Sequence, residues 1–263
     1  MAVQIHPTAL IDKGAELGVN VSIGPYSIIG AHVVVGDDTS IGAHNIIEGH
    51  TSIGRANQIG HHITLGGVPQ DKKYAGEPTE LIIGDRNVIR EFCSFHLGTT
   101  QDNGVTRIGD DNWIMGYVHL AHDCVIGNQT ILASNVQLAG HVEVHDHAII
   151  GGMSGAHQFV KIGAHAMVGG GSVLLKDIPP FVMASGNTAV PHGINSEGLK
   201  RRGFSTEQIM AIKRAYKAIY RQELTLEQAI LKINEAAAAD PLTADSLMLL
   251  NAFLSNSTRG ITR

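Results

Sequence analysis

An aliphatic residue, usually branched, recurs at every sixth position over most of the first 174 residues of this chain. The first run comprises Ile5, Ile11, Leu17, Ile23, Ile29, Val35, Ile41, Ile47, Ile53, Ile59 and Leu65. The series resumes at Ile83, slips by one residue after Phe95, and then runs from Ile108 to Leu174. A period of six matches neither the turn of an α-helix nor simple strand alternation, so it predicts a mainly β fold, a parallel β-helix. Three units form one coil, so residues eighteen positions apart are expected to stack about 4.8 Å apart.

Two polar segments interrupt the repeat, near residues 66–81 and 100–107. Excursions from a rigid repeat architecture often carry function, because the coils hold them in place. The aliphatic series ends at Leu174, and the β-helix is therefore predicted to occupy residues 1–190.

The remaining residues, 191–263, have a helical pattern. The strings STEQ at 205–208 and TLEQ at 225–228 are capping boxes, each followed by apolar residues at helical spacing. A third helix is predicted from Asp240 toward Phe253. This C-terminal α-helical domain is expected to cover the last coil, whose open edge would otherwise favour aggregation.

The composition excludes several classes of protein. The formal net charge is −5 and only 16% of the residues are charged, which argues against a nucleic-acid-binding protein. No apolar segment approaches the roughly 18 residues that span a bilayer, and the first residues lack a signal-peptide pattern. Cys93 and Cys124 are too few for a disulfide framework, and both fall at interior positions of the repeat. These features predict a cytoplasmic protein with no membrane span.

The string HLAHDC, at residues 119–124, brings histidine and aspartate into the repeat. His122 and Asp123 fall in the turn of their unit and are therefore expected to project outward. Counting eighteen residues forward brings further polar residues and a glycine to the same corner of the next two coils. The residues expected to gather there are His119, His122, Asp123, Gly140, His141, His157 and Gln158.

Three interpretations of this corner are open. The histidines could bind zinc and leave one position for water. They could also be polar surface residues of a structural solenoid. In the third interpretation, His122 is a general base, Asp123 fixes its tautomer, and Gly140 offers a backbone N–H to an oxyanion. The residue types favour acyl transfer over metal-dependent hydration without excluding the other interpretations.

Several long strings give the chain a resemblance to a known family. They are QDKKYAGEPTE at 70–80, AHDCVIGN at 121–128, LAGHVEV at 138–144, GGMSGAHQF at 151–159 and GINSEGLKRRGFS at 193–205. In these strings the chain resembles the UDP-N-acetylglucosamine O-acyltransferases that begin lipid A synthesis. The resemblance implies a left-handed β-helix, an exception to the right-handed preference of parallel crossovers. It also implies a homotrimer with active sites between neighbouring subunits.

The resemblance assigns chemistry to the corner as well. It implies that His122 deprotonates the 3-hydroxyl of the glucosamine unit of UDP-N-acetylglucosamine. The hydroxyl then attacks the thioester of a 3-hydroxyacyl chain on acyl carrier protein, with neither a metal nor another cofactor. Asp123 matches the residue that orients the base, and Gly140 matches the oxyanion donor.

The remaining assignments concern substrate binding. Residues matching sugar-nucleotide contacts are Asp71, Lys73, His119, His141, His157 and Gln158, whereas Asn195, Glu197, Arg201 and Arg202 match nucleotide and carrier-side contacts. Guanidinium groups suit bidentate binding of phosphate. Gly170 occupies the position that limits acyl length, and because glycine leaves the groove open we expect a chain of about fourteen carbons.

Four other functions are weighed against this one. The N-acyltransferase that acts later in the same pathway carries an additional N-terminal domain, for which hexads beginning at Ile5 leave no room. A sugar O-acetyltransferase that uses acetyl-coenzyme A fits the long strings less well. A metal-dependent hydratase of the γ-carbonic anhydrase type would contain zinc. A non-catalytic scaffold would show no turnover.

Overall fold

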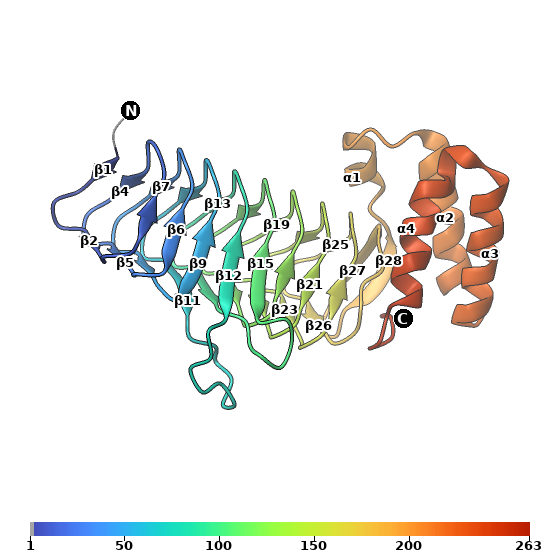
Figure 1. Ribbon diagram of the computed structural model, residues 1–263. Helices are drawn as coiled ribbons and strands as arrows, with labels where there is room; N and C mark the ends of the chain where they lie inside the picture. Colours follow the sequence, from blue (N-terminus) through green and yellow to red (C-terminus); the bar gives the residue numbers. More distant parts are fainter. Residues whose placement is uncertain (1–2) are drawn as a thin grey trace.

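The computed structural model describes residues 3–263 and shows a solenoid of short strands followed by a group of helices (Figure 1). The strands form three sheets, and up to β26 every third strand of the chain is a neighbour within a sheet, as a three-sided coil requires. All neighbouring strands are parallel except the last two, which form an antiparallel pair.

The bounds of the strands follow the six-residue repeat. The 11-stranded sheet contains β1 (Gln4–Ile5), β4 (Ser22–Ile23), β7 (Ser40–Ile41), β10 (Gln58–Ile59), β13 (Val88–Ile89), β16 (Trp113–Ile114), β19 (Ile131–Leu132), β22 (Ile149–Ile150), β25 (Met167–Val168), β27 (Val182–Ser185) and β28 (Val190–Ile194). The nine-stranded sheet contains β2 (Leu10–Ile11), β5 (Ile28–Ile29), β8 (Ile46–Ile47), β11 (Thr64–Gly67), β14 (Ser94–His96), β17 (His119–Leu120), β20 (Gln137–Leu138), β23 (Gly155–Ala156) and β26 (Val173–Leu174). The eight-stranded sheet contains β3 (Glu16–Leu17), β6 (Val33–Val35), β9 (His50–Ile53), β12 (Glu80–Ile83), β15 (Val105–Ile108), β18 (Val125–Ile126), β21 (Glu143–Val144) and β24 (Lys161–Ile162).

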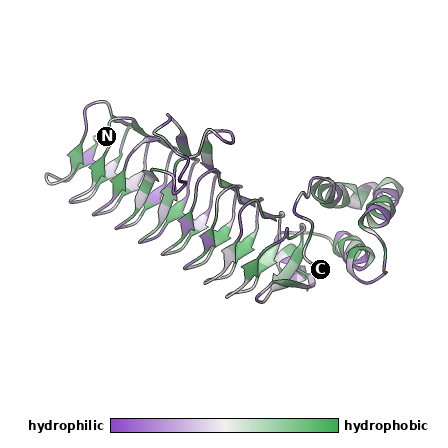
Figure 2. Ribbon diagram, turned by 90° about the horizontal axis from the view of Figure 1, so that it is seen from below, coloured by the Kyte–Doolittle hydropathy of each residue, from purple (hydrophilic) through white to green (hydrophobic). Residues whose placement is uncertain are grey.

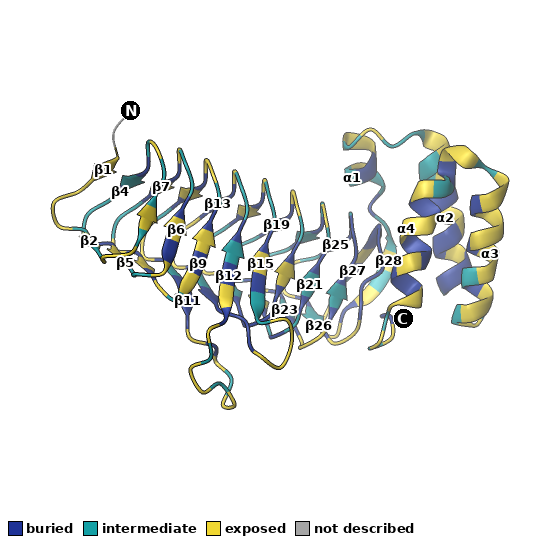
Figure 3. Ribbon diagram, in the orientation of Figure 1, coloured by how far each residue is buried: buried dark blue, intermediate teal, exposed yellow. Residues whose placement is uncertain are grey.

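The register of the strands confirms the predicted stacking. Ile5 pairs with Ile23, eighteen residues later. Ile59 pairs with Ile89, and Ile89 pairs with Ile114, so the two predicted interruptions are loops between coils that otherwise keep their register. We call residues 68–79, between β11 and β12, the first excursion, and residues 97–104, between β14 and β15, the second excursion. Much of the first excursion is exposed (Figure 3).

The aliphatic series forms the core of the solenoid. Ile29, Ile47 and Leu65 are 0% exposed, whereas Ile5, in the first coil, is 43% exposed because no coil covers it. Hydrophobic residues recur in the strands of successive coils in Figure 2. The burial of this series is the main source of stability, since each fully buried aliphatic side chain contributes about 1.5–3 kcal/mol.

At the corners of the coils, non-glycine residues adopt the left-handed conformation. Asp123, His141 and Phe159, in three successive coils, have φ values of 59°, 62° and 65°. The backbone N–H of His141 donates to the carbonyl of His122 in the coil before it, at 3.0 Å. This conformation costs an ordinary L-residue about 1–2 kcal/mol, and Asn, Asp and His adopt it more readily than most.

A different corner, between the 11-stranded and nine-stranded sheets, carries a column of aromatic rings. Tyr26, His44, His62, Phe92 and Tyr117 are stacked with ring centroids between 4.7 and 5.2 Å apart. We call these five residues the aromatic column. All five members are exposed in the single chain, with Phe92 at 46%.

The burial of the two cysteines gives a first testable prediction. Cys93 and Cys124 are 2% and 0% exposed, and each thiol donates to a backbone carbonyl. Burial raises the pKa of both thiols to about 12, so neither forms an appreciable amount of thiolate at neutral pH. Iodoacetamide should leave both unmodified in the native protein and should alkylate both in guanidinium chloride, as read by mass spectrometry. Rapid alkylation of the native protein would contradict their placement in the core.

Four helices follow the solenoid. They are α1 (Ser196–Arg201), α2 (Thr206–Tyr220), α3 (Leu226–Ala239) and α4 (Pro241–Ser255). The capping boxes predicted at Ser205 and Thr225 are both formed, and the predicted third helix is α4. Strand β28 crosses the predicted boundary at residue 190, so the helices begin only at Ser196. Buried residues of the helices pack on Phe181 at the end of the solenoid.

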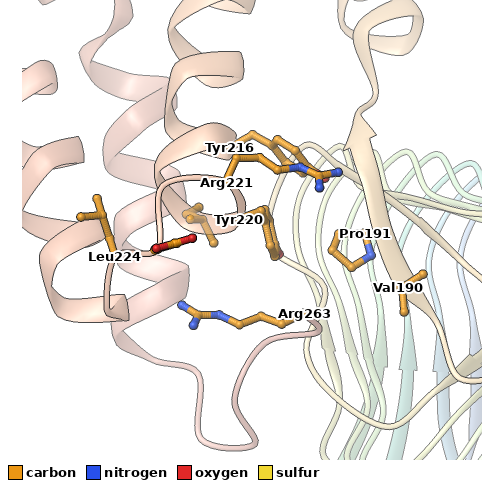
Figure 4. A pocket seen from close by; sticks show the side chains of 9 residues that line it. Val190, Pro191, Tyr216, Tyr220, Arg221, Leu224 and Arg263 are labelled. Atoms are coloured by element: carbon orange, nitrogen blue, oxygen red, sulfur yellow. The ribbon is translucent and has the colours of Figure 1, made fainter.

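The junction between solenoid and helices contains a cavity of about 430 Å³ (Figure 4). Val190 and Pro191 of β28 lie on one side, and Tyr220 and Arg221 from the end of α2 lie on the other. None of the residues predicted for the functional site lines this cavity.

Candidate active site

Two cavities meet at His122, which lies at the corner between β17 and β18. The first, of about 760 Å³, is polar, and we call it the polar cavity. It is lined by Gln70, Asp71, Lys72, Lys73, Gln101, Asp102, His122, His141, Gln158 and Phe159. The second, of about 490 Å³, lies along the outer face of the nine-stranded sheet and has a mostly apolar floor that includes Leu138, Ala156 and Val173. We call it the apolar cavity, and it also contains Gly140, His119 and His157.

His122 and Asp123 form a hydrogen-bonded pair. His122 Nδ1 lies 2.8 Å from Asp123 Oδ2, so the ring proton is on Nδ1 and Nε2 is available as a base. Thr99 donates to the same carboxylate twice, from its backbone N–H to Oδ1 at 2.8 Å and from its hydroxyl to Oδ2 at 2.7 Å. The backbone N–H of Asp123 donates in turn to Thr106 Oγ1. These bonds fix the carboxylate and, through it, the imidazole plane.

The prediction that His122 and Asp123 project outward is wrong in one respect. Their side chains are only 7% and 2% exposed, although both residues lie in a turn of the coil. The second excursion folds over this corner and places Thr99 on the carboxylate, which removes Asp123 from water. A buried carboxylate needs such donors, because an unpaired charge away from water is unstable.

Gly140 lies directly against the imidazole of His122. A Cβ atom built on Gly140 would lie 2.5 Å from His122 Cε1 and 2.7 Å from Nε2. The φ of Gly140 is outside the left-handed region, so the glycine is required by this close approach rather than by turn conformation. Within residues 3–263, no acceptor bonds the N–H of Gly140.

The structure brings together most of the residues predicted to bind substrate. Asp71 and Lys73 line the polar cavity with His141, and Gln158 lies between the two cavities. His119 lines the apolar cavity, and its Nδ1 lies 2.9 Å from Ser94 Oγ. Burial, with a smaller effect of His96, lowers the pKa of His119, which keeps this ring neutral at physiological pH.

Five predicted residues do not lie in either cavity of the single chain. They are Gly170, Asn195, Glu197, Arg201 and Arg202. Asn195 caps helix α1 by accepting from the N–H of Gly198, and Glu197 pairs with Lys200 at 2.8 Å. Arg202 donates to the carbonyl of His147 on the solenoid, and burial lowers its pKa.

Several residues of the site were missed in the sequence. Thr99 and Thr106 donate to or accept from Asp123 of the His122–Asp123 pair, Asp102 bonds to His141, and Gln70 lines both cavities. Lys72 also lines the polar cavity, beside Lys73. The signal that they share in the sequence is their place in or next to the two breaks of the repeat.

The group His122, Asp123 and His141 has the residue types of a metal site, with donor atoms within 4.8 Å of one another. Both oxygens of Asp123 are already hydrogen-bonded, and His122 Nδ1 is occupied by the same carboxylate. Asp123 is therefore already used to orient the imidazole of His122. A carboxylate in this role is found in acid–base centres and also behind metal-bound histidines, so metal analysis is needed to separate the two.

A three-sided coil of six-residue units with a buried histidine–aspartate pair at one corner defines a hexapeptide-repeat transferase. Residues 106–140 match the family model described as bacterial transferase hexapeptide (six repeats). Residues 177–262 match the model described as UDP N-acetylglucosamine O-acyltransferase, domain 2.

Similar proteins extend this match to the whole chain. An acyl-[acyl-carrier-protein]–UDP-N-acetylglucosamine O-acyltransferase of Thiobacillus denitrificans is 64% identical, over 98% of this chain and 99% of the relative. One of Verminephrobacter eiseniae is 58% identical over the same shares. Among solved structures, LpxA from Acinetobacter baumannii has a TM-score of 0.94 and 48% identity, over 98% of this chain and 99% of that one. The chain belongs to the acyl-[acyl-carrier-protein]–UDP-N-acetylglucosamine O-acyltransferase family, and it is an acyltransferase with that family's left-handed β-helix.

Proposed function

We propose that this chain transfers a 3-hydroxyacyl group from acyl carrier protein to the 3-hydroxyl of UDP-N-acetylglucosamine, the first step of lipid A biosynthesis. The observation that carries the proposal is the His122–Asp123 pair at the meeting point of a polar and an apolar cavity. A polar sugar nucleotide and a long acyl chain need two such cavities with a base between them. The names of the relatives support the same pair of substrates.

The chemistry needs one base and one oxyanion donor. Nε2 of His122 takes the proton of the sugar 3-hydroxyl while the oxygen forms a bond to the thioester carbonyl carbon. The N–H of Gly140, which has no acceptor among residues 3–263, donates to the oxyanion. The carbon–sulfur bond then breaks, and the carrier thiolate takes the proton from the imidazolium. Asp123 stabilises that cation, and neither a metal nor another cofactor is required.

We assign the sugar nucleotide to one cavity and the acyl chain to the other. Asp71, Lys73 and His141 in the polar cavity would hold the sugar nucleotide, with Gln158 at its boundary. The apolar cavity, which His119 and His157 line, would hold the start of the acyl chain. A Cβ atom on Gly170 would meet only backbone atoms of Gly152, at 3.2 Å and beyond. The proposed acyl chain of about fourteen carbons rests on the absence of a side chain at this position, which leaves nothing there to shorten a groove formed beside it.

Assembly as a homotrimer would explain why five predicted residues lie outside the cavities. If Gly170, Asn195, Glu197, Arg201 and Arg202 act on the same ligands, they must come from a neighbouring subunit. The outward residues of the nine-stranded sheet carry no acidic or basic charge from Leu10 to Val173, whereas the eight-stranded sheet shows Glu16, Arg107, Glu143 and Lys161. The uncharged face and the adjoining aromatic column support an interface there.

A change in the aromatic column tests the assembly. The intact protein should have three times the 27.9 kDa mass of the chain in analytical ultracentrifugation. Phe92→Asp should shift it toward smaller species and lower the activity, because a carboxylate would be buried without a partner. Ser52→Asp, on the exposed outer face of the eight-stranded sheet, is the control and should keep the wild-type mass. A wild-type monomer would refute the trimer.

The proposed reaction is tested directly with substrates. Purified protein is incubated with UDP-N-acetylglucosamine and a panel of 3-hydroxyacyl carrier proteins, with and without a metal chelator. We expect a 3-O-acylated product whose yield peaks near a fourteen-carbon donor and does not fall on chelation. Stoichiometric zinc together with loss of activity on chelation would favour a metal-dependent enzyme instead. Absence of turnover with every donor would favour a scaffold.

The location of the protein stays a prediction. Among residues 3–263, no helix has the length and apolar character needed to cross a bilayer. A cytoplasmic site of action is proposed from the composition and from the carrier-bound donor.

A further inference from the structure

The second excursion holds two groups of the site at once. Thr99, at one end of a tight turn, donates to Asp123, and the N–H of Asp102 closes that turn on the carbonyl of Thr99. The carboxylate of Asp102 then reaches His141, whose Nδ1 lies 2.8 Å from Asp102 Oδ2. The corner therefore contains two carboxylate–histidine pairs that share one loop.

The ring of His141 contacts several neighbouring side chains. Its ring stacks on Phe159, with centroids 4.3 Å apart and planes 8° from parallel. It meets the ring of His122 edge to face at 5.0 Å. Its Nε2 lies 3.8 Å from Asp123 Oδ2, too far for a hydrogen bond, and the residue lines the polar cavity. Stacking fixes the plane of the ring, and among residues 3–263 Asp102 supplies the one hydrogen bond to a ring nitrogen, at Nδ1.

We propose that Asp102 is a positioning residue that keeps the proton of His141 on Nδ1. When His141 carries its proton on Nδ1 alone, its Nε2 is a hydrogen-bond acceptor at the edge of the polar cavity that the residue lines, 3.8 Å from Asp123 Oδ2. The group it would bind is a donor, such as a hydroxyl of a sugar. The choice of UDP-N-acetylglucosamine as the ligand rests on the proposed function, whereas the tautomer does not.

The tautomer is measured first, without any substrate. Nitrogen-15 spectra of the histidine side chains, with His141→Gln used for assignment, should show Nδ1 protonated in the wild type. Asp102→Ala should shift His141 toward the Nε2-protonated form. Asp102→Asn keeps an acceptor oxygen and should shift it less. An unchanged His141 spectrum in Asp102→Ala would overturn the proposal.

Kinetics then tests the consequence for binding. Asp102→Ala should raise the KM for UDP-N-acetylglucosamine about tenfold, with kcat changed less, because outer partners of a functional histidine act through orientation. In a His141→Ala background, Asp102→Ala should have no further effect, since the two residues act as one unit. Asn103→Ala, in the same exposed turn, is the matched control and should resemble the wild type. Additive losses from Asp102 and His141 would contradict the positioning role.

The two measurements separate the possible failures. If the wild-type protein shows no acyl transfer, the proposed function is refuted, but the result on the His141 tautomer is unaffected. If the enzyme is active but the His141 spectrum does not change in Asp102→Ala, only the positioning role of Asp102 is refuted.

Discussion

His122→Ala should lower kcat by about 10²–10⁴, the usual contribution of a general base. The reason is that Nδ1 of His122 bonds to Asp123, which leaves Nε2 free to act as the base beside Gly140. Steady-state rates with the carrier-bound donor and UDP-N-acetylglucosamine measure the effect. The KM for the sugar nucleotide should change little, because the base acts on the transition state.

Two controls accompany this variant. His6→Ala removes an exposed imidazole whose hydrogen bonds, among residues 3–263, are to Thr8 in the first coil, and it should be as active as the wild type. The thermal unfolding midpoint and the oligomeric mass of His122→Ala should match the wild type. Near-normal turnover of His122→Ala would exclude His122 as the base.

Gly140→Ala should reduce kcat by about 100-fold or more, because a displacement of about 1 Å in a reacting group has this effect. The added methyl would lie 2.5 Å from His122 Cε1, so the imidazole must move away from its place against Gly140. The N–H of residue 140 is kept, and the loss therefore reports the position of the base rather than the oxyanion donor. Rates at saturating substrates measure it.

The control for this change is another glycine. Gly193→Ala in β28 places a methyl where no heavy atom lies within 4 Å, and its φ is ordinary. It should leave the unfolding midpoint unchanged. Full activity of Gly140→Ala would show that the site tolerates a displaced imidazole and would weaken the assigned geometry.

The solenoid and its corner could be predicted because the position of each residue in a coil follows from its place in the six-residue repeat. Once aliphatic residues mark the interior, each other position has a place in its coil. The placement of Gly140 over His122 follows from counting eighteen residues, and the contact distances confirm it. The starts of helices α2 and α3 could also be predicted, since the capping boxes at Ser205 and Thr225 depend on local sequence and not on tertiary structure.

The covering of the corner could not be predicted in this way. The two excursions have no period, so nothing in their residues says that Thr99 folds back onto Asp123 or that Asp102 reaches His141. For this reason the prediction that His122 and Asp123 project outward did not anticipate their burial. Arg202, at the C-cap of helix α1, shows a second limit, because in the proposed trimer its place relative to the cavities depends on a neighbouring subunit, which no count along one chain supplies.

The left-handed corners of the coils have a consequence for how such a site can arise. Asn20, Asp38, His62 and Asn135 occupy corners with the same backbone conformation as Asp123. The side chains that adopt this conformation most readily are thus the ones that donate, accept and transfer protons. An acid–base pair could therefore appear on an already folded edge by exchange of side chains alone, with no change in the path of the chain. In such a solenoid, catalytic ability is a matter of which corner a loop comes to cover.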